Sequence, residues 1–271
     1  MAKRKRLTTE KTIRNKIREG RGVGRLADYQ PWLRIQDVPS QGLACRSKGW
    51  KTQRVHHVLS LLELRHFYVL EWAPRVLDIR EQFPLLPLEE TIAIATSCGI
   101  RHPVHPVTRH PVVLTTDFVI TIKASSAEPD LPQTVKYEDD LCSRRVLEKL
   151  ELERRYWSAR GKNLAIVTEE QIPKALAANV EWIHAYRYRE NFSDLDDLSF
   201  SLTASTVLKG ICNHSLPLRD ITMQLDDRMG VEVGTSLSIT RYLIANRHLH
   251  VDMLQPINPS ERLNLKKKKP E

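Results

Sequence analysis

The chain has 271 residues, of which 41% are hydrophobic, so it can form one large or two ordinary packed domains and is not disordered throughout. Lys and Arg number 42 against 33 Asp and Glu, which gives a formal net charge of +9 and favours a polyanionic partner. No apolar run is long enough to cross a bilayer, and no hydrophobic segment follows the basic start MAKRKR. We therefore expect no membrane span and no secretion signal, and we predict a protein of the cytoplasm.

The chain begins with a predicted short helix over residues 8–19, followed by a glycine-rich loop over 20–24. This loop ends a helix and does not follow a strand, so it does not match a dinucleotide-binding fingerprint. Arg21 and Arg25 stand among its glycines, and we consider both as candidates to lie along a phosphate backbone.

A buried helix is predicted over residues 58–72, which are apolar on nearly every side. Glu63 lies within it, and its neighbours on the helix surface are Leu59, Phe67 and Leu70. An ionised carboxylate in such surroundings is costly unless its charge is compensated. Glu63 is therefore expected either to pair with a buried arginine or to point into a cleft that holds a cation.

The rest of this half mixes strands and helices, which predicts an α/β unit with a mixed sheet. The predicted strands follow β-prone or Pro-terminated runs, and the loop between the second and third is rich in Ser, Pro and acidic residues. In chain order, the elements are a strand over 76–86, a helix over 88–97, strands over 112–123 and 133–137, a helix over 140–161 and a strand over 163–168.

Asp117 lies in the middle of the second of these strands, where a lone carboxylate is disfavoured. If the two strands pair in antiparallel fashion, Asp117 and Lys136 reach one edge, and Glu63 can approach from the buried helix. Hydrolysis of a phosphodiester needs carboxylates that hold divalent cations, and a lysine that orients water or stabilises negative charge. Oxygen ligands with open positions suit Mg²⁺ or Mn²⁺. A structural Asp–Lys pair at a sheet edge has the same spacing, so spacing alone leaves both interpretations open.

Cys98, His102, His105 and His110 lie close together in the sequence, as the ligands of a zinc site could. Prolines alternate with these histidines, so we favour a turn-rich polar loop beside a nucleic-acid surface. Zinc binding stays the less favoured alternative.

The second half begins near residue 170 and is mainly helical. Two helices followed by a ribbon with alternating hydrophobic residues indicate a winged-helix module. Its predicted parts are a helix over 172–186, a polar linker over 187–197, a helix capped by Ser215, a helix over 236–246, a strand over 249–253 and a basic tail, Lys266–Lys269.

Five stretches resemble the TnsA family, the endonuclease subunits of TnsABC-type heteromeric transposases, including CRISPR-associated ones. They occur in order and with compatible spacing, and strings as long as VLDIREQFPLL are far more specific than a three-residue motif. The matching stretches are YQPWLRIQDVPS (29–40), KTQRVHHVLSLLELRHF (51–67), LEWAPRVLDIREQFPLLP (70–87), TTDF (115–118) and LEKLELERRYW (147–157).

The resemblance implies a restriction-endonuclease-like catalytic domain over residues 1–169 and a winged-helix domain over 170–271. The family's catalytic acids and lysine fall where this chain has Glu63, Asp117 and Lys136.

The resemblance also implies a bound Mg²⁺, or Mn²⁺ as a substitute, with ligands from Glu63, Asp117 and the residues before the lysine, Thr134 and Val135. Thr134 departs from the family pattern, which often has Glu or Gln at this position. A hydroxyl is a weaker ligand, so the second metal position is in doubt, and Gln133 or Glu138 are possible substitutes.

By resemblance, the chain cuts the 5′ strands at transposon ends, while a TnsB-type transposase cuts and joins the 3′ ends. A TnsC-type ATPase is the other implied partner, and we expect it to dock on the C-terminal domain. The alternative is a non-catalytic adaptor that bridges transposon ends and the ATPase. His56, His57 and Arg80 are further candidates for DNA contact, each with a structural role as the alternative.

Overall fold

The computed structural model describes residues 7–38, 44–124, 129–213 and 215–266. The chain divides into two compact units, Met1–Ile172 and Pro173–Glu271, which we call the N-terminal and C-terminal units. Most of the predicted basic tail, Lys267–Lys269, lies outside the described residues. None of the helices in the described ranges is long and apolar enough to cross a membrane.

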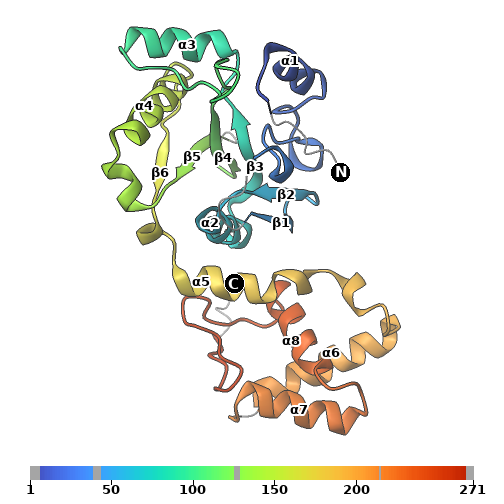
Figure 1. Cartoon of the computed structure of the whole chain (residues 1–271). Helices are drawn as coiled ribbons and strands as arrows, with labels where there is room; N and C mark the ends of the chain where they lie inside the picture. Colours follow the sequence, from blue (N-terminus) through green and yellow to red (C-terminus); the bar gives the residue numbers. More distant parts are fainter. Residues whose placement is uncertain (1–6, 39–43, 125–128, 214, 267–271) are drawn as a thin grey trace. The chain divides into compact units, whose positions relative to one another are not determined.

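A four-stranded sheet forms the centre of the N-terminal unit (Figure 1). Its strands lie in the order β3-β4-β5-β6, and the first three are antiparallel while β5 and β6 are parallel. The predicted mixed sheet flanked by helices is therefore confirmed. The strands are β3 (Val76–Pro84), β4 (Thr115–Ile122), β5 (Asp130–Val135) and β6 (Ala165–Val167).

Helix α4 packs on this sheet through its two adjacent aromatic residues. Tyr156 and Trp157 are buried with Leu85 and Val119, and the indole of Trp157 donates a 2.7 Å hydrogen bond to the hydroxyl of Thr116. Aromatic residues that bury a large area and satisfy their polar atom fix the position of a helix well. The helices of this unit are α1 (Glu10–Arg18), α2 (Leu61–Trp72), α3 (Leu88–Ser97) and α4 (Arg144–Ser158), with 3-10 turns at Leu26–Asp28, Ile35–Asp37, Glu138–Cys142 and Glu169–Gln171.

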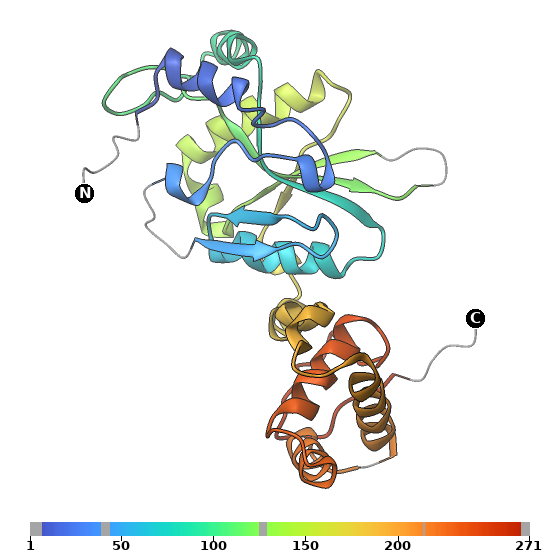
Figure 2. The same cartoon turned by 90° about the vertical axis from the view of Figure 1, so that its right-hand side faces the viewer.

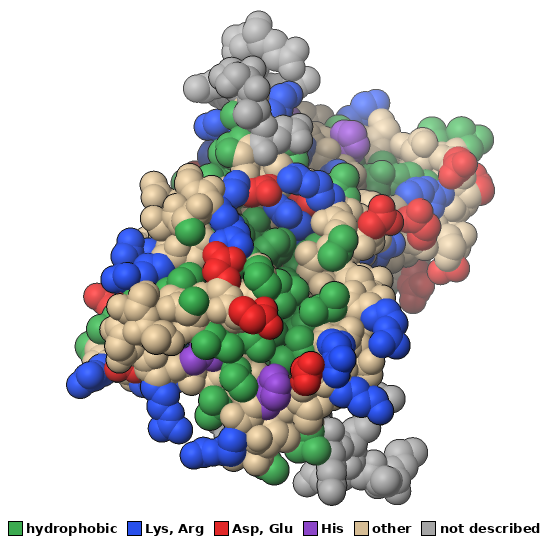
Figure 3. All heavy atoms as spheres, turned by 90° about the horizontal axis from the view of Figure 1, so that it is seen from above, with side chains coloured by type: hydrophobic (Ala, Val, Ile, Leu, Met, Phe, Trp, Pro, Cys, Tyr) green, Lys and Arg blue, Asp and Glu red, His purple; other side chains and the backbone are tan. Residues whose placement is uncertain are grey.

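The end of the N-terminal unit that carries α3 and α1 is seen from above in Figure 3. Hydrophobic side chains gather near the centre of this face, and Lys and Arg side chains lie around them. On this face the Lys and Arg side chains therefore do not gather in one patch.

The helix predicted over 58–72 is shorter than expected, because it is preceded by a two-stranded sheet. Strands β1 (Cys45–Lys48) and β2 (Val55–Val58) pair in antiparallel fashion, and α2 begins only at Leu61. The hydroxyl of Ser60 caps the helix by accepting the backbone N–H of Glu63. The prediction was wrong here because an apolar run does not reveal where a strand gives way to a helix.

The C-terminal unit contains one more helix than predicted. Helix α6 begins at the last residue of the expected linker, Asp197, and continues to Asn213. Its Ser and Thr residues gave it no clear apolar period. Helix α8 packs against α5, α6 and α7 and forms the centre of the unit. The elements are α5 (Lys174–His184), 3-10 turns at Ala185–Arg187 and Arg189–Phe192, α6 (Asp197–Asn213), α7 (Leu218–Met229) and α8 (Thr235–Ala245).

The ribbon predicted after α8 is reduced to a single bridge between Val251 and Leu265. In addition, every residue of α8 is buried or half-buried, so this helix presents no exposed face. A winged-helix module that reads DNA needs an exposed helix for the groove. The winged-helix assignment therefore stays a prediction, and α8 is not a recognition helix in this arrangement.

Candidate active site

Glu63 lies in the first turn of α2 and is buried. Its carboxylate accepts hydrogen bonds from the Ser60 hydroxyl (2.9 Å), the Leu59 N–H (3.2 Å) and the Gln82 amide (3.4 Å). No Lys or Arg in the described residues forms an ion pair with it, so the first alternative, a buried arginine partner, is excluded there. These neutral donors orient the carboxylate and leave its charge without a counter-ion.

Asp117 is held across the β4–β5 pair. The strand register joins Phe118 to Gln133, which brings Asp117 to the next residues of β5. Its Oδ2 accepts the Thr134 hydroxyl at 3.0 Å and the Val135 N–H at 2.8 Å. Thr134 therefore uses its hydroxyl hydrogen to position Asp117, and its metal contact stays a prediction.

Lys136 follows directly after β5 and completes the predicted group. Its ammonium donates to Asp117 Oδ2 at 2.8 Å and to the carbonyl oxygen of Val135 at 2.9 Å. Burial is the largest single effect and lowers the pKa of Lys136, but the charge and hydrogen bond of Asp117 and the charges of Glu153 and Glu63 together outweigh it, so the net pKa is raised. The lysine is therefore charged at neutral pH.

The charge of Asp117 also reaches Glu63. Burial, followed by repulsion from Asp117, raises the pKa of Glu63 to about 7, and Lys136 partly opposes this rise. The three residues predicted from sequence thus lie within electrostatic range of one another although they come from α2, β4 and the end of β5. A raised carboxylate pKa beside a second acid is typical of functional sites that hold cations.

Glu153 is a further acid of this site that sequence reasoning missed. It belongs to α4 and is buried. Burial, and then the charge of Asp117, raise its pKa to about 8, while hydrogen bonds with Thr116 and Thr134 oppose the rise. Its Oε1 is buried and has no hydrogen-bond partner in the described part of the chain.

A signal for Glu153 was present in the sequence. It follows Leu150 by three positions and precedes Trp157 by four, so it falls on the apolar stripe of the helix. The charged run around it suggested a solvated face and concealed this position.

The oxygen atoms of the site fit a hard divalent cation. Asp117 Oδ2 and the Val135 carbonyl already hold a cationic group between them, the ammonium of Lys136, and Glu153 Oε1 is a buried oxygen without a donor. No three His, Cys, Asp or Glu side chains of the described ranges lie close enough together to hold an ion as they stand. Mg²⁺ needs only one or two carboxylates, with carbonyls and water completing its shell.

Gln133 serves another purpose than the metal contact considered for it. Its Oε1 lies 2.7 Å from His66 Nε2, and the His66 ring packs edge-on against Phe118. His66 follows Glu63 by one turn of α2. Its contact with Gln133 therefore fixes α2 against β5, the strand that leads to Lys136. Glu138, the other substitute, is exposed.

Three of the five candidate DNA contacts are buried among carboxylates. Arg21 bonds Glu19 and Asp37. Arg80 pairs with Asp130 at 2.6 Å, and His56 lies fully buried against Glu81. Side chains that are enclosed and paired in this way support the fold and do not reach a DNA backbone.

The other two candidates remain accessible. Arg25 is about half exposed and pairs with Asp130 at 3.2 Å. His57 is half-buried in β2, and its Nδ1 accepts the N–H of Ile35. Both stay predictions as DNA contacts.

The histidine-rich loop makes local contacts of its own. His102 bonds the hydroxyl of Thr91 and the carbonyl of Pro103, while His110 contacts the carbonyl of Pro111. Since the described residues contain no group of three possible ligands, the structure gives no support for zinc at Cys98.

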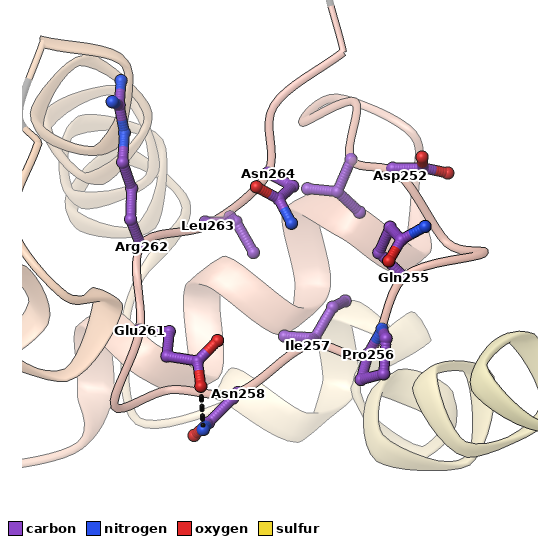
Figure 4. Close-up of a pocket in the computed structure, with 10 residues that line it drawn as sticks. Asp252, Gln255, Pro256, Ile257, Asn258, Glu261, Arg262, Leu263 and Asn264 are labelled. Carbon is purple, nitrogen blue, oxygen red and sulfur yellow. Dashed lines mark hydrogen bonds between the residues drawn. The ribbon is translucent and has the colours of Figure 1, made fainter.

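A separate small hollow lies in the C-terminal unit (Figure 4). Asp252, Gln255, Asn258 and Glu261 line it, and Asn258 donates to Glu261 at 2.9 Å. Its volume of about 10 Å³ is at the lower limit for one water molecule. The hollow contains none of the predicted site residues.

Two family models match the chain, one for each half. Residues 73–169 match the TnsA-like endonuclease N terminal, and residues 171–253 match the TnsA endonuclease C terminal. The chain is also 41% identical over 246 residues to the Transposon Tn7 transposition protein TnsA of Escherichia coli, which covers 91% of this chain and 87% of that protein. The chain belongs to the TnsA endonuclease family. The resemblance stated from the sequence is thereby confirmed.

The TnsA family match includes most of the site. Asp117, Lys136 and Glu153 fall within the N-terminal match, whereas Glu63 precedes its first residue by ten positions. The N-terminal family model therefore leaves Glu63 out, and it is the structure that brings Glu63 near Asp117 and Lys136.

Proposed function

We propose that the chain is a Mg²⁺-dependent DNA endonuclease that cleaves the 5′ strands at the ends of a transposon. Membership of the TnsA family makes it the endonuclease subunit of a heteromeric transposase. The observation that supports metal-dependent hydrolysis most directly is the position of the Lys136 ammonium between Asp117 Oδ2 and the Val135 carbonyl, with Glu63 and Glu153 nearby.

In this proposal Glu63, Asp117, Thr134 and the Val135 carbonyl would hold the metal, and Glu153 would complete the acidic surroundings. A divalent cation in this place lowers the pKa of bound water and neutralises charge at the scissile phosphate. Thr134 and the Val135 N–H keep the Asp117 carboxylate in place. Lys136 orients the attacking water, and hydrolysis leaves a 5′-phosphate and a 3′-hydroxyl.

The proposed partners are a TnsB-type transposase, which cuts and joins the 3′ ends, and a TnsC-type ATPase that docks on the C-terminal unit. The substrate is transposon-end DNA, so we place the protein in the bacterial cytoplasm.

The test is strand cleavage in a reconstituted reaction with the partner transposase, end-containing DNA and Mg²⁺ or Mn²⁺. Asp117→Ala and Glu63→Ala are expected to abolish 5′ cutting while 3′ cutting by the partner continues. The variants must retain the wild-type circular dichroism spectrum. Full 5′ cutting by either variant would refute the assignment.

The same reaction separates the endonuclease from the non-catalytic adaptor. An adaptor binds transposon ends but leaves the 5′ strands intact with every divalent metal. Mn²⁺-stimulated nicking by the wild-type chain, lost in Asp117→Ala, supports the endonuclease.

A further inference from the structure

A long segment without acidic residues precedes Glu63 in the chain. Residues 38–62 contain no Asp or Glu, although 33 of the 271 residues are acidic, and they contain four Lys or Arg and two His. The next acidic residue along the chain is Glu63, which belongs to the proposed active site. The segment therefore brings only positive or neutral side chains up to the catalytic carboxylate.

The described part of this segment folds into the β1–β2 hairpin, whose two faces differ. Ser47, His56 and Val58 point inward and are buried. Arg46 lies directly opposite His57 on the other face, where Arg46 is exposed and His57 is half-buried. Because side chains alternate along a strand, the outward face is the basic one.

A buried ionic network anchors the hairpin to β3. The guanidinium of Arg54 donates to both oxygens of Glu81 at 2.8 and 2.6 Å, and His56 Nδ1 lies 2.7 Å from Glu81. The other nitrogen of His56 lies 2.7 Å from the hydroxyl of Thr52. Arg54 and His56 therefore stabilise the fold, and their contacts with Glu81 hold the hairpin and its outward face in place.

Strand β1 and the turn at Ile35–Asp37 both contact His57. Arg46 faces it across the strand pair, and the backbone N–H of Ile35 donates to its Nδ1. Burial lowers the pKa of His57 most, the charge of Glu81 opposes this, and the charges of Arg46, Arg34 and Arg54 lower the pKa further. The carboxylate that reaches His57 is Glu81, which Arg54 and His56 already engage.

His57 can donate a hydrogen bond even when it is neutral. Its Nδ1 accepts the Ile35 N–H, so the network assigns the ring proton to Nε2. A neutral Nε2–H beside two guanidinium groups is a donor set for phosphate oxygens.

This surface leads directly to the catalytic acid. Leu59, two residues after His57, donates its N–H to the Glu63 carboxylate. Two residues of extended chain span about 7 Å. Figure 2 shows the hairpin running alongside α2, the helix that carries Glu63 in its first turn.

We propose that the outward face of the β1–β2 hairpin, formed by Arg46 and His57 with Arg34 beside them, binds the phosphodiester backbone of DNA next to the bond that is cut. This inference rests on the proposed endonuclease function and adds the surface that positions its substrate. Contacts of this kind fix the register of the protein on DNA without reading its sequence.

The experiment measures equilibrium binding of the purified full chain to a fluorescent end-containing duplex over a range of salt concentrations without divalent metal. Arg46→Ala is expected to weaken binding about tenfold and to reduce the slope of log K against log salt concentration by about 0.9, the value for one lost phosphate contact. Arg46→Glu should weaken binding further, and Arg46→Lys should restore most of the slope.

Arg144→Ala is the matched control. Its side chain is 93% exposed on α4 and pairs with Glu148 of its own helix. This variant should bind DNA with the wild-type affinity and slope. An equal loss in the control would show a general charge effect and would overturn the assignment to the hairpin.

Two further outcomes overturn the proposal. The first is an unchanged affinity and slope for folded Arg46→Glu. The second is unchanged DNA binding combined with weaker partner-dependent cutting, which would mean that the hairpin contacts a protein. Binding is measured without cleavage, so failure of the wild-type chain to cut DNA rejects the proposed function and leaves the hairpin result standing on its own.

Discussion

The ammonium of Lys136 donates to Asp117 Oδ2 at 2.8 Å and to the carbonyl oxygen of Val135 at 2.9 Å. These are two of the oxygen atoms proposed to hold a metal. Lysine and a divalent cation therefore compete for the same negative charge. The raised pKa of Lys136 means that this competition takes place against a fully charged ammonium at neutral pH.

Lys136→Met is expected to reduce 5′ cutting by about 10²–10³-fold, because an electrostatic group at the reacting phosphate is lost. Its metal-free melting temperature should fall, since Asp117 loses its counter-ion. Mn²⁺ should then raise that temperature by more than in the wild type. Thermal melts with and without Mn²⁺ measure both effects, and Lys149→Met on the exposed face of α4 is the control.

Glu153→Gln tests the acid that the structure adds to the site. The neutral amide removes a buried charge, so this variant should be more stable than the wild type at pH 8 without metal, by about 2–4 kcal/mol. It should also lose most of the stabilisation by Mn²⁺. Urea unfolding measures both quantities.

Glu151→Gln, two residues away, serves as its control, because Glu151 pairs with Arg154 and Arg155 at the surface. If Glu153→Gln destabilises the chain and keeps the full response to Mn²⁺, Glu153 is structural and not part of the metal site.

The metal requirement should depend on pH. The pKa values of Glu63, about 7, and Glu153, about 8, lie above the usual range, so both acids are largely protonated at pH 6. Metal binding needs their ionised forms. The Mg²⁺ concentration that gives half-maximal cutting should therefore fall as the pH rises from 6 to about 8.5. A requirement that does not change with pH would contradict the placement of these acids at the metal.

The same acids should make the metal-free chain less stable as the pH rises. A carboxyl group whose pKa is raised by folding binds more protons in the folded than in the unfolded state, between the unfolded value near 4.5 and the folded value. The contribution of Glu63 and Glu153 to the free energy of unfolding is therefore fully present below about pH 4.5. It is lost as the pH rises from there to about 8. Glu63→Gln/Glu153→Gln should flatten this part of the stability profile.

Glu81 should behave in the opposite way. Burial opposes ionisation, but His56 and Arg54 hold the pKa of Glu81 well below its usual range. Its contribution to stability is present above the unfolded value and is lost as the pH falls through the acid range. Glu81→Gln should destabilise the N-terminal unit by about 3–5 kcal/mol, because it leaves the buried Arg54 guanidinium without its counter-ion. Glu148→Gln, in a surface pair on α4, should change stability much less than Glu81→Gln does.

The amino-acid sequence alone determined the family of the chain and the mixed α/β character of its N-terminal unit. The β-prone runs predicted β4 and β5, and the cost of a carboxylate in an apolar helix drew attention to Glu63. Spacing left the roles of Asp117 and Lys136 open, and the family resemblance favoured a catalytic role, which stays a prediction. The strands and the family could be predicted because strand periodicity and long matching strings are local properties of the sequence.

Tertiary structure alone decided which charged residues are available. Arg21, Arg80 and His56 looked like DNA contacts but are buried with carboxylates distant in the sequence, while Glu153 looked solvated and is buried near Asp117. Charge is visible in a sequence, but burial and pairing depend on contacts between distant segments. For the same reason the β1–β2 hairpin, whose strands are only four residues long, emerged only when its inward face packed on α2 and β3.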